Sequence, residues 1–432
     1  MIHKKIISTL IGLGIVGSLT ACGGLNGSEP DVIPVLHESS GIDSTRDNIE
    51  DNRFDVEDEA PEDSENAAGE GDSSDKDEGG ALGSGGEKVD DKDSFTENTE
   101  NTEESVQQEE TLVRKITVTA TGDCSLGALQ THGYDGSFHA YYDAYGEGYF
   151  MENFEELFQS DDFTLVNLEC TLTNRSYNPE DNPEKEFYIV GRPEYAGILS
   201  NSGVEGCSLG NNHTRDVGAG GLEDTMNTCD EHGLLWAYND VTATYVTEDG
   251  YKIGFVSSNL SGLAERENYM RNGIAELRES DVDLVIACCH WGIERENYPT
   301  DYQRMLAHEF IELGADLIIG NHPHVVQGVE YYQGKVICYS LGNFSFGANR
   351  NPGDKGTVVF QQTFTFVDGK LQPELSARII PARVTSVTAY NNFQPTPTEG
   401  EEREEMLNRM RQYSEPYSSV QFDEEGNILI GE

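Results

Sequence analysis

Short apolar runs bounded by turn residues alternate with amphipathic stretches along the middle of the chain, between residues 115 and 330. Compact apolar runs of this kind are typical of strands buried in a sheet. The clearest helical pattern between them covers 302–313, with apolar residues on one face and Gly314 placed to cap its end. Strands that alternate with helices predict an α/β sandwich. The expected strands cover residues 116–120, 163–168, 206–209, 253–257, 284–289 and 317–319.

The pattern changes after residue 329, where apolar runs follow one another without helices between them. Such runs predict antiparallel strands, and the pair Asp368-Gly369 between two of them predicts a hairpin turn. A polar helix is expected over 399–413. The expected antiparallel strands cover residues 336–339, 357–367 and 375–380.

The first 110 residues show no comparable pattern. A short basic segment and an apolar run of about 15 residues lead to Leu19-Thr20-Ala21-Cys22, which is similar to a bacterial lipobox. That similarity implies a lipid on Cys22, which would anchor the mature chain to the membrane outside the cytoplasm, at the bacterial cell surface.

Residues 23–110 hold 29 acidic and 5 basic residues. A segment of this composition cannot bury enough apolar area to offset the entropy lost on ordering, so we expect a disordered acidic tether. The chain then divides into a lipoprotein signal peptide over 1–22, the tether over 23–110, a folded domain over 111–385 and a C-terminal extension over 386–432.

Charge restricts the partners of the chain. The formal net charge of −51 excludes nucleic acid, because a polyanion would be repelled. Residues 111–432 hold 50 acidic and 21 basic residues, so the folded part is acidic in its own right. An anionic substrate there needs local positive charge, and bound metal ions are the obvious source.

The chain has eight cysteines and no CxxC pair. Most of those after Cys22 lie in apolar runs, where free cysteine packs as a small hydrophobic residue, so we expect mainly buried free thiols. A disulfide outside the cytoplasm stays open, since sequence cannot pair it.

Polar residues with donor atoms follow five of the expected strands. Open α/β sheets place ligands at the carboxyl ends of their strands, so these residues are expected to meet. Pro323 favours an extended His322, which would turn His322 and His324 to the same side. The five segments are Thr121-Gly122-Asp123, Asn167-Leu168-Glu169, Gly210-Asn211-Asn212-His213, His290-Trp291-Gly292 and Gly320-Asn321-His322-Pro323-His324.

Imidazole, carboxylate and carboxamide groups together suit Zn²⁺, Mn²⁺ or Fe better than a thiolate-bound metal. Taken singly, a histidine at a strand end is more often a hydrogen-bonded structural residue. Four histidines outside any such motif are assigned that structural role, namely His132, His139, His232 and His308.

The segment Asn211-Asn212-His213-Thr214-Arg215-Asp216-Val217-Gly218 resembles the NNHxxDxG motif of CapA-type capsule-synthesis proteins. The segments around His290-Trp291-Gly292-Ile293-Glu294, around His322-Pro323-His324 and around Tyr339-Ser340-Leu341-Gly342-Asn343-Phe344 resemble the same family. The resemblance covers residues 115–346. It implies a fold like that of the calcineurin-like metallophosphoesterases, which is a four-layer α/β sandwich, here with C-terminal antiparallel strands.

The resemblance also implies residue roles around two divalent metal ions, whose identity (Mn, Zn or Fe) stays open. Asp123 and His324 would bind the first ion, and Glu169 would bridge the pair. Asn212, His290 and His322 would bind the second ion. His213, oriented by Asp216, would give a proton to the leaving oxygen.

Three positions depart from the pattern. The bridging residue is Glu169, a longer carboxylate than is usual there, which would change the spacing of the ions. Ser125 stands where metallophosphoesterases carry the histidine of an Asp-x-His motif, and Arg295 replaces a tyrosine that CapA-type proteins tend to carry. The first metal position therefore lacks the imidazole of that motif and keeps only His324.

The resemblance favours a surface-anchored protein of poly-γ-glutamate capsule or cell-envelope polymer synthesis and export, working beside a polyglutamate synthetase or export complex. Two alternatives stay open. One is a general extracellular metal-dependent phosphoesterase, and the other is a non-catalytic assembly or export subunit on the same fold. Metal content and turnover of a generic phosphoester would separate the enzyme from the scaffold.

Overall fold

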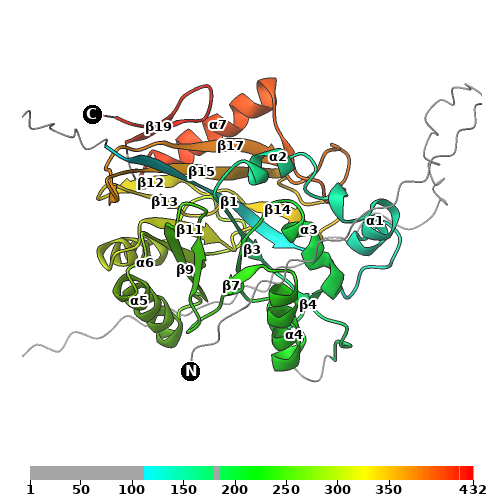
Figure 1. Ribbon diagram of the computed structural model, residues 1–432. Helices are drawn as coiled ribbons and strands as arrows, with labels where there is room; N and C mark the ends of the chain where they lie inside the picture. Colours follow the sequence, from blue (N-terminus) through cyan, green and yellow to red (C-terminus); the bar gives the residue numbers. More distant parts are fainter. Residues whose placement is uncertain (1–110, 179–184, 418, 432) are drawn as a thin grey trace, which may run out of the picture. The chain divides into compact units, whose positions relative to one another are not determined.

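The computed structural model describes residues 111–178, 185–417 and 419–431. Cys22, the signal peptide and the expected tether lie outside the described residues. Two large sheets form the centre of the described part, which belongs to one compact unit (Figure 1).

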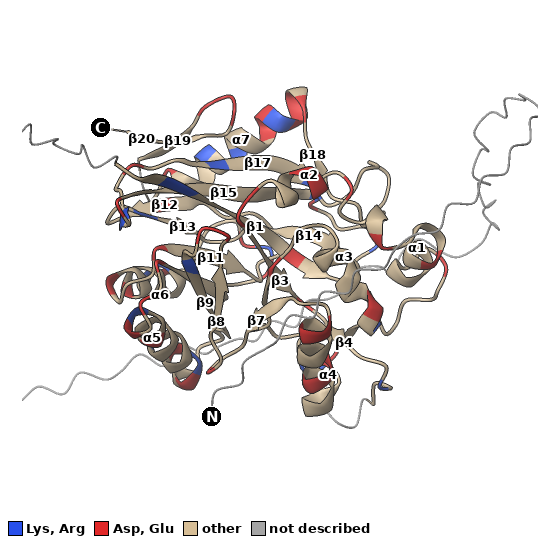
Figure 2. Cartoon of the chain, in the orientation of Figure 1, with Lys and Arg blue, Asp and Glu red and all other residues tan. Residues whose placement is uncertain are grey.

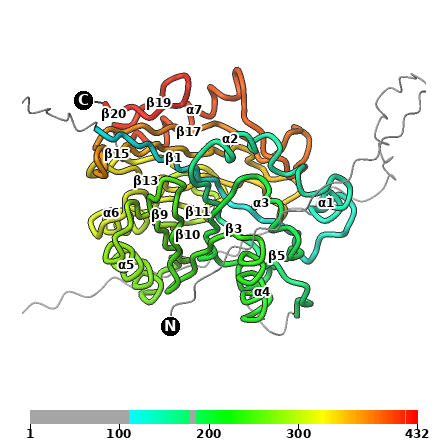
Figure 3. The backbone as a smooth tube through the Cα atoms, in the orientation of Figure 1, coloured from blue at the N-terminus to red at the C-terminus, as the bar shows by residue number. Residues whose placement is uncertain are grey.

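The first sheet has the strand order β18-β17-β15-β1-β3-β6-β7, with β14 beside β1 and β16 beside β15. β1, β3, β6, β7 and β14 run parallel, whereas β15, β17 and β18 are antiparallel to their neighbours. Figure 3 shows β1, at the start of the described chain, beside β15 from its last third. The bounds are β1 Val113–Ser125, β3 Phe163–Leu168, β6 Gly206–Ser208, β7 Leu235–Ala237, β14 Asn343–Phe346, β15 Gly356–Val367, β16 Lys370–Leu371, β17 Ala377–Arg383 and β18 Thr396–Pro397.

The second sheet has the order β12-β13-β11-β10-β9-β8. Its four central strands are parallel, and β8 and β12 are antiparallel at the two edges. The bounds are β8 Ala243–Val246, β9 Lys252–Asn259, β10 Leu284–His290, β11 Leu317–Asn321, β12 Val329–Tyr332 and β13 Lys335–Cys338.

Helices cover the outer face of each sheet. Residues of α1, α2, α3 and α4 share a core cluster with the first sheet, and residues of α5 and α6 share one with the second. The bounds are α1 Phe138–Tyr145, α2 Glu155–Gln159, α3 Ala196–Ser200, α4 Gly218–Glu231, α5 Ala264–Glu279, α6 Asp301–Glu312 and α7 Gly400–Ser414, with short 3₁₀ turns at Glu147–Tyr149 and Pro193–Tyr195. Small strands pair at β2 Ala128–Leu129, β4 Thr171–Leu172, β5 Ile189–Gly191, β19 Val420–Phe422 and β20 Ile428–Ile430.

β10 shows why these strands read as continuous apolar runs. Ile286 packs in the core between the two sheets, whereas its neighbours Val285 and Ala287 pack against α5 and α6. Successive side chains of a strand point to opposite faces, so a strand covered on both sides needs apolar residues at every position. The α/β sandwich is confirmed as four layers, with three buried clusters between them.

The strands expected between residues 116 and 319 and the helix expected over 302–313 are confirmed within a few residues. Asp368 and Gly369 form the expected turn, both with positive φ. One prediction is wrong in part: the strand expected over 336–339 is antiparallel to β12 but parallel to β11. An apolar run reports burial but does not identify the partner strand.

The helix expected over 399–413 is α7, and its buried side is apolar. Met406, Leu407 and Met410 pack into the core between the two large sheets. Part of the expected C-terminal extension, residues 386–432, therefore packs on the same core as the expected domain over 111–385.

The seven cysteines of the described residues are buried free thiols. Among the described helices, none has both the length and the apolar character needed to cross a membrane.

Candidate metal centre

The candidate residues meet where the carboxyl ends of parallel strands from both sheets come together. Asp123 lies near the end of β1, with Asn167 of β3 on one side and Asn343 of β14 on the other. A side chain at Gly122 would be 2.0 Å from the Gly342 oxygen, which accepts a 2.8 Å hydrogen bond from the Asp123 amide. Glycine therefore allows the close approach that fixes Asp123.

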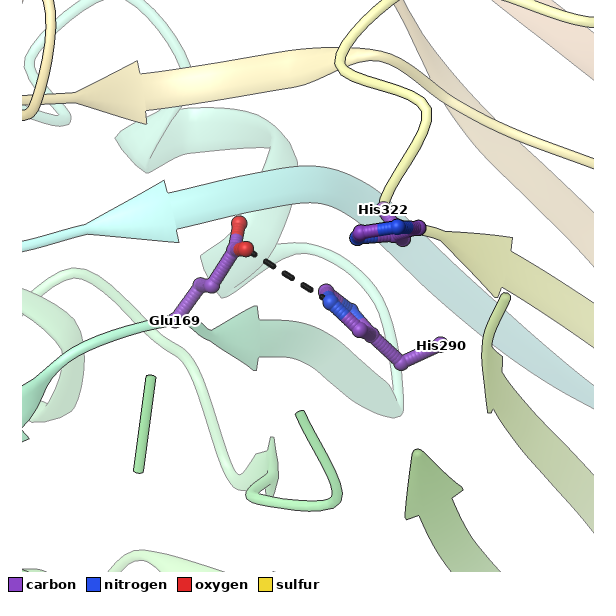
Figure 4. A group of neighbouring side chains, drawn as sticks. All are labelled: Glu169, His290 and His322. Atoms are coloured by element: carbon purple, nitrogen blue, oxygen red, sulfur yellow. Dashed lines mark ion pairs between the residues drawn. The ribbon is translucent and has the colours of Figure 1, made fainter. Parts of the chain in front are cut away.

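The donor atoms form three groups, and within each group all the donor atoms lie within 4.8 Å of one another. Figure 4 shows the first, with Glu169 Oε1 3.5 Å from His290 Nε2 and His322 beside them. Because the groups share residues, they form one continuous cluster. The groups are Glu169, His290 and His322; Asp123, Glu169 and His324; and Glu294, His322 and His324.

Glu169 is the most informative residue of this cluster. It is 0% exposed, and neither carboxylate oxygen has a hydrogen-bond partner within the described part of the chain. Burial, and then the charge of Asp123, raises the pKa of Glu169 well above its ordinary value. A buried carboxylate without donors is costly, and a bound cation is the partner that would offset the cost. The site therefore fits a divalent ion.

Asp123 and His324 belong to the part of the centre next to β14. His324 Nδ1 lies 3.1 Å from Asp123 Oδ2 and 3.0 Å from Asn343 Oδ1, while its Nε2 lies 3.8 Å from Glu169 Oε1. Burial lowers the pKa of His324, but the charges of Glu169 and Asp123 outweigh it and raise the pKa to about 10. Charges that favour a proton on this ring also favour a cation beside it.

His290 and Asn212 lie on the other side of Glu169. His290 Nε2 is 2.8 Å from Asn212 Oδ1, and His290 is 1% exposed. Burial, and then the neighbouring His322, lowers the pKa of His290 well below its ordinary value. The neutral imidazole that results is the form that binds metals.

The backbone at His322 and His324 differs from the prediction. Their φ angles are +99° and +58°, so His322 is not extended before Pro323. Both rings still reach the cluster, because two left-handed residues turn the chain around Pro323. Non-glycine residues in this region are strained, and such strain concentrates at functional sites.

His213 lies beside the cluster and takes no part in the three donor groups. Its Nδ1 is 2.8 Å from Asp216 Oδ2, as the expected orienting pair requires. Asp216 also accepts a hydrogen bond from the Ile189 amide at 2.6 Å and forms an ion pair with Lys185 at 2.5 Å. His213 is 7% exposed, so its ring is held rigidly rather than free in solvent.

Three residues near the centre were not assigned a role from the sequence. Asn167 Nδ2 donates to Asp123 Oδ1 at 2.8 Å. Asn343 Oδ1 lies 3.0 Å from His324 Nδ1, and Asn343 Nδ2 donates to the His324 carbonyl oxygen at 3.2 Å. Asn343 lies in a segment that resembles the family, and Asn167 lies in one of the segments expected at a strand end. Lys185 carried no signal, since neither spacing nor a motif distinguishes it.

Ser125 does not replace the missing imidazole. Its hydroxyl donates to the Glu169 carbonyl oxygen at 3.1 Å, so it holds the backbone of Glu169. The histidines expected to be structural lie outside all three donor groups. Two of them hydrogen-bond elsewhere, with His139 2.7 Å from the Tyr195 hydroxyl and His308 2.9 Å from Glu330.

Replacing Lys185 with methionine should lower the free energy of unfolding by about 3 kcal/mol. The ammonium pairs with Asp216, whose side chain is 0% exposed, and its loss would leave a buried charge with less compensation. Chemical denaturation measures the effect. In a double-mutant cycle, Asp216→Asn should recover part of the loss, and purely additive effects would contradict the coupling.

Residues 117–348 match the family model described as "Bacterial capsule synthesis protein PGA_cap". The capsule biosynthesis protein CapA of Bacillus anthracis is 26% identical, over 54% of this chain and 60% of the relative. The PGA biosynthesis protein CapA of Bacillus subtilis is 32% identical, over 44% of this chain and 55% of the relative. The chain thus spans somewhat more than half the length of these relatives.

A solved structure of a purple acid phosphatase from yellow lupin is similar over 67% of this chain and 55% of its own, with 8% identity and a TM-score of 0.30. So low a score adds nothing to the fold, which the strand order itself defines.

Proposed function

The chain belongs to the PGA_cap family of bacterial capsule synthesis proteins, and on that premise we propose that it acts in capsule or cell-envelope polymer synthesis and export through a dinuclear metal site of the phosphoesterase type. Poly-γ-glutamate is the proposed polymer, and the name of the Bacillus subtilis relative, a PGA biosynthesis protein, supports this choice. The observation that carries the metal site is the buried Glu169 carboxylate, which faces imidazoles and lacks hydrogen-bond donors.

In this proposal Asp123 and His324 hold one ion, and Asn212, His290 and His322 hold the other, with Glu169 between them. Two divalent ions would supply positive charge for a phosphoryl oxygen and an activated water for attack. The surrounding chain is acidic, as Figure 2 shows on α4, so little other positive charge is offered to an anion.

The residues of the chain position a proton beside that centre. Asp216 fixes the His213 ring through Nδ1, which leaves Nε2 as the nitrogen that exchanges a proton with a leaving oxygen. Asn211 holds the same loop, because its Oδ1 accepts from the His213 and Thr214 amides at 2.9 and 3.0 Å.

Metal analysis of the purified full chain followed by a screen of phosphoesters tests this function. Two ions per chain with turnover of a phosphodiester would support it. Metal without turnover would favour the non-catalytic assembly subunit, and turnover without any capsule defect on gene deletion would favour the general phosphoesterase. A chain that binds no divalent ion would reject the proposed site.

Anchoring at the cell surface is a separate proposal, supported by the lipobox-like segment that ends at Cys22. There the folded domain would work beside a polyglutamate synthetase or export complex. Cys22→Ser should release the protein from the membrane fraction or stall its processing, because the thiol that takes the lipid is lost. Cell fractionation checks this, and a variant that stays membrane-bound with unchanged mobility would contradict the lipid anchor.

A further inference from the structure

The loop that follows β10 has a defined backbone conformation. Gly292 has φ +89°, and a side chain there would lie 2.7 Å from the Gln303 side-chain oxygen, so the turn requires glycine. Arg295 also has positive φ, at +65°. Residues 291–298 are therefore folded into one defined path although most of them are exposed.

Hydrogen bonds join this loop to the segment that carries His322 and His324. Three of them cross between the two segments, so the positions of the loop and of the imidazoles are coupled. They run from the Arg295 amide to the Pro323 oxygen at 2.8 Å, from Asn297 Nδ2 to the Val326 oxygen at 3.1 Å, and from Gln327 Nε2 to the Glu296 oxygen at 2.8 Å.

This loop places Glu294 against the two imidazoles. One carboxylate oxygen of Glu294 and one nitrogen each of His322 and His324 lie within 4.8 Å of one another. One nitrogen of this histidine pair, His322 Nδ1, is buried and has no hydrogen-bond partner in the described chain. The exposed Glu294 carboxylate thus lies close to two histidines, one of which carries a buried nitrogen without a partner.

We propose that Glu294 is a further metal ligand, which binds from the solvent side the ion held by Asp123 and His324, next to His322 of the neighbouring position. The proposal rests on the proposed dinuclear function, and it adds a donor to it. Glu169 is fully buried and Glu294 is exposed, so the two carboxylates approach the imidazole pair from the inner and the outer side.

The donor chemistry supports this assignment. Asp123 and Glu169 bring two negative charges to a pair of divalent ions, and Ser125 brings no imidazole to the first position. A third carboxylate restores a donor and balances more of the positive charge. Because Glu294 is exposed, an incoming anion would be able to displace it without moving the buried ligands.

Titration of the chelator-treated full chain with Mn²⁺, followed by calorimetry and electron paramagnetic resonance, tests the ligand without relying on activity. Glu294→Gln removes the charge and keeps the shape. We expect it to weaken one Mn²⁺ site by at least about 10-fold, the lower end of what even an outer-shell partner contributes. The matched control is Glu296→Gln, since Glu296 is exposed in the same loop and belongs to no donor group.

Retained affinity at both sites in Glu294→Gln would overturn the assignment and leave the dinuclear site standing. An equal loss in Glu296→Gln would also overturn it, because loop charge rather than ligation would then explain the effect. A wild-type chain that binds no Mn²⁺ and no Zn²⁺ would reject the dinuclear site and Glu294 together. Thermal unfolding of the chelated variants confirms that each one is folded.

Discussion

Replacing Glu169 with alanine is expected to abolish metal binding and to lower phosphoester hydrolysis by about 10³-fold or more. Glu169 belongs to two of the three donor groups, so its loss removes a ligand from both ion positions at once. Removing even one electrostatic group from an active site costs about 10²–10³-fold in rate. Metal content by mass spectrometry and the initial rate with a phosphodiester measure the two effects.

In the metal-free protein, by contrast, a substitution at Glu169 should increase stability. Glu169→Gln is expected to raise the free energy of unfolding by about 1 kcal/mol in the presence of a chelator, because it removes a buried charge that has no hydrogen-bond donor. Added metal should stabilise the wild type and leave the variant unchanged, since only the wild type binds it.

Glu330→Gln is the matched control for both measurements. Glu330 is also a buried glutamate, but its oxygens lie 2.9 Å from His308 and 2.6 Å from the Tyr339 hydroxyl. Its replacement should keep the metal and lower the metal-free stability by about 1–3 kcal/mol. Equal destabilisation by the two substitutions would contradict the view that Glu169 is retained for binding.

The sequence predicted most elements of the fold because most strands are buried on both faces. A strand such as β10 must be apolar at every position, and this leaves a run that stands out from its surroundings. Such an apolar run does not indicate whether the strand pairs in parallel or antiparallel. For this reason β13 was expected to be antiparallel, although it also pairs in parallel with β11.

The part of the candidate site that lies at the ends of strands was predictable from the sequence. Four of the residues lie at, or directly after, the carboxyl ends of strands that meet, so topology alone brings them together: Asp123, Glu169, His290 and His322. Contacts made by loops were not predictable. Lys185 pairs with Asp216 only because the fold brings their two segments together, and no local sequence pattern indicates this contact.

The backbone at His322 shows a second limit of sequence reasoning. Proline restricts the residue before it, and this restriction favoured an extended His322. The structure instead gives φ +99°, because both imidazoles must meet the carboxylates of Asp123 and Glu169 from one short loop. At His322 the geometry of the candidate metal centre therefore outweighs the local backbone preference of a residue before proline.

Replacing His213 with alanine is expected to leave metal affinity unchanged and to lower kcat by about 10²–10⁴-fold, the usual contribution of a general acid or base. His213 lies outside the three donor groups, so metal content should not respond. The control is His232→Ala, which removes an exposed histidine at the other end of α4 and should change neither quantity.

The leaving group separates proton donation by His213 from a merely structural role. A good leaving group such as p-nitrophenolate needs little protonation, whereas an alkoxide needs it fully. The rate loss in His213→Ala should therefore be small for p-nitrophenyl esters and large for alkyl esters. Asp216→Asn should follow the same trend more weakly, because the carboxylate acts only through the 2.8 Å contact with His213 Nδ1. An equal loss for both substrates would mean that His213 shapes the site rather than donates a proton.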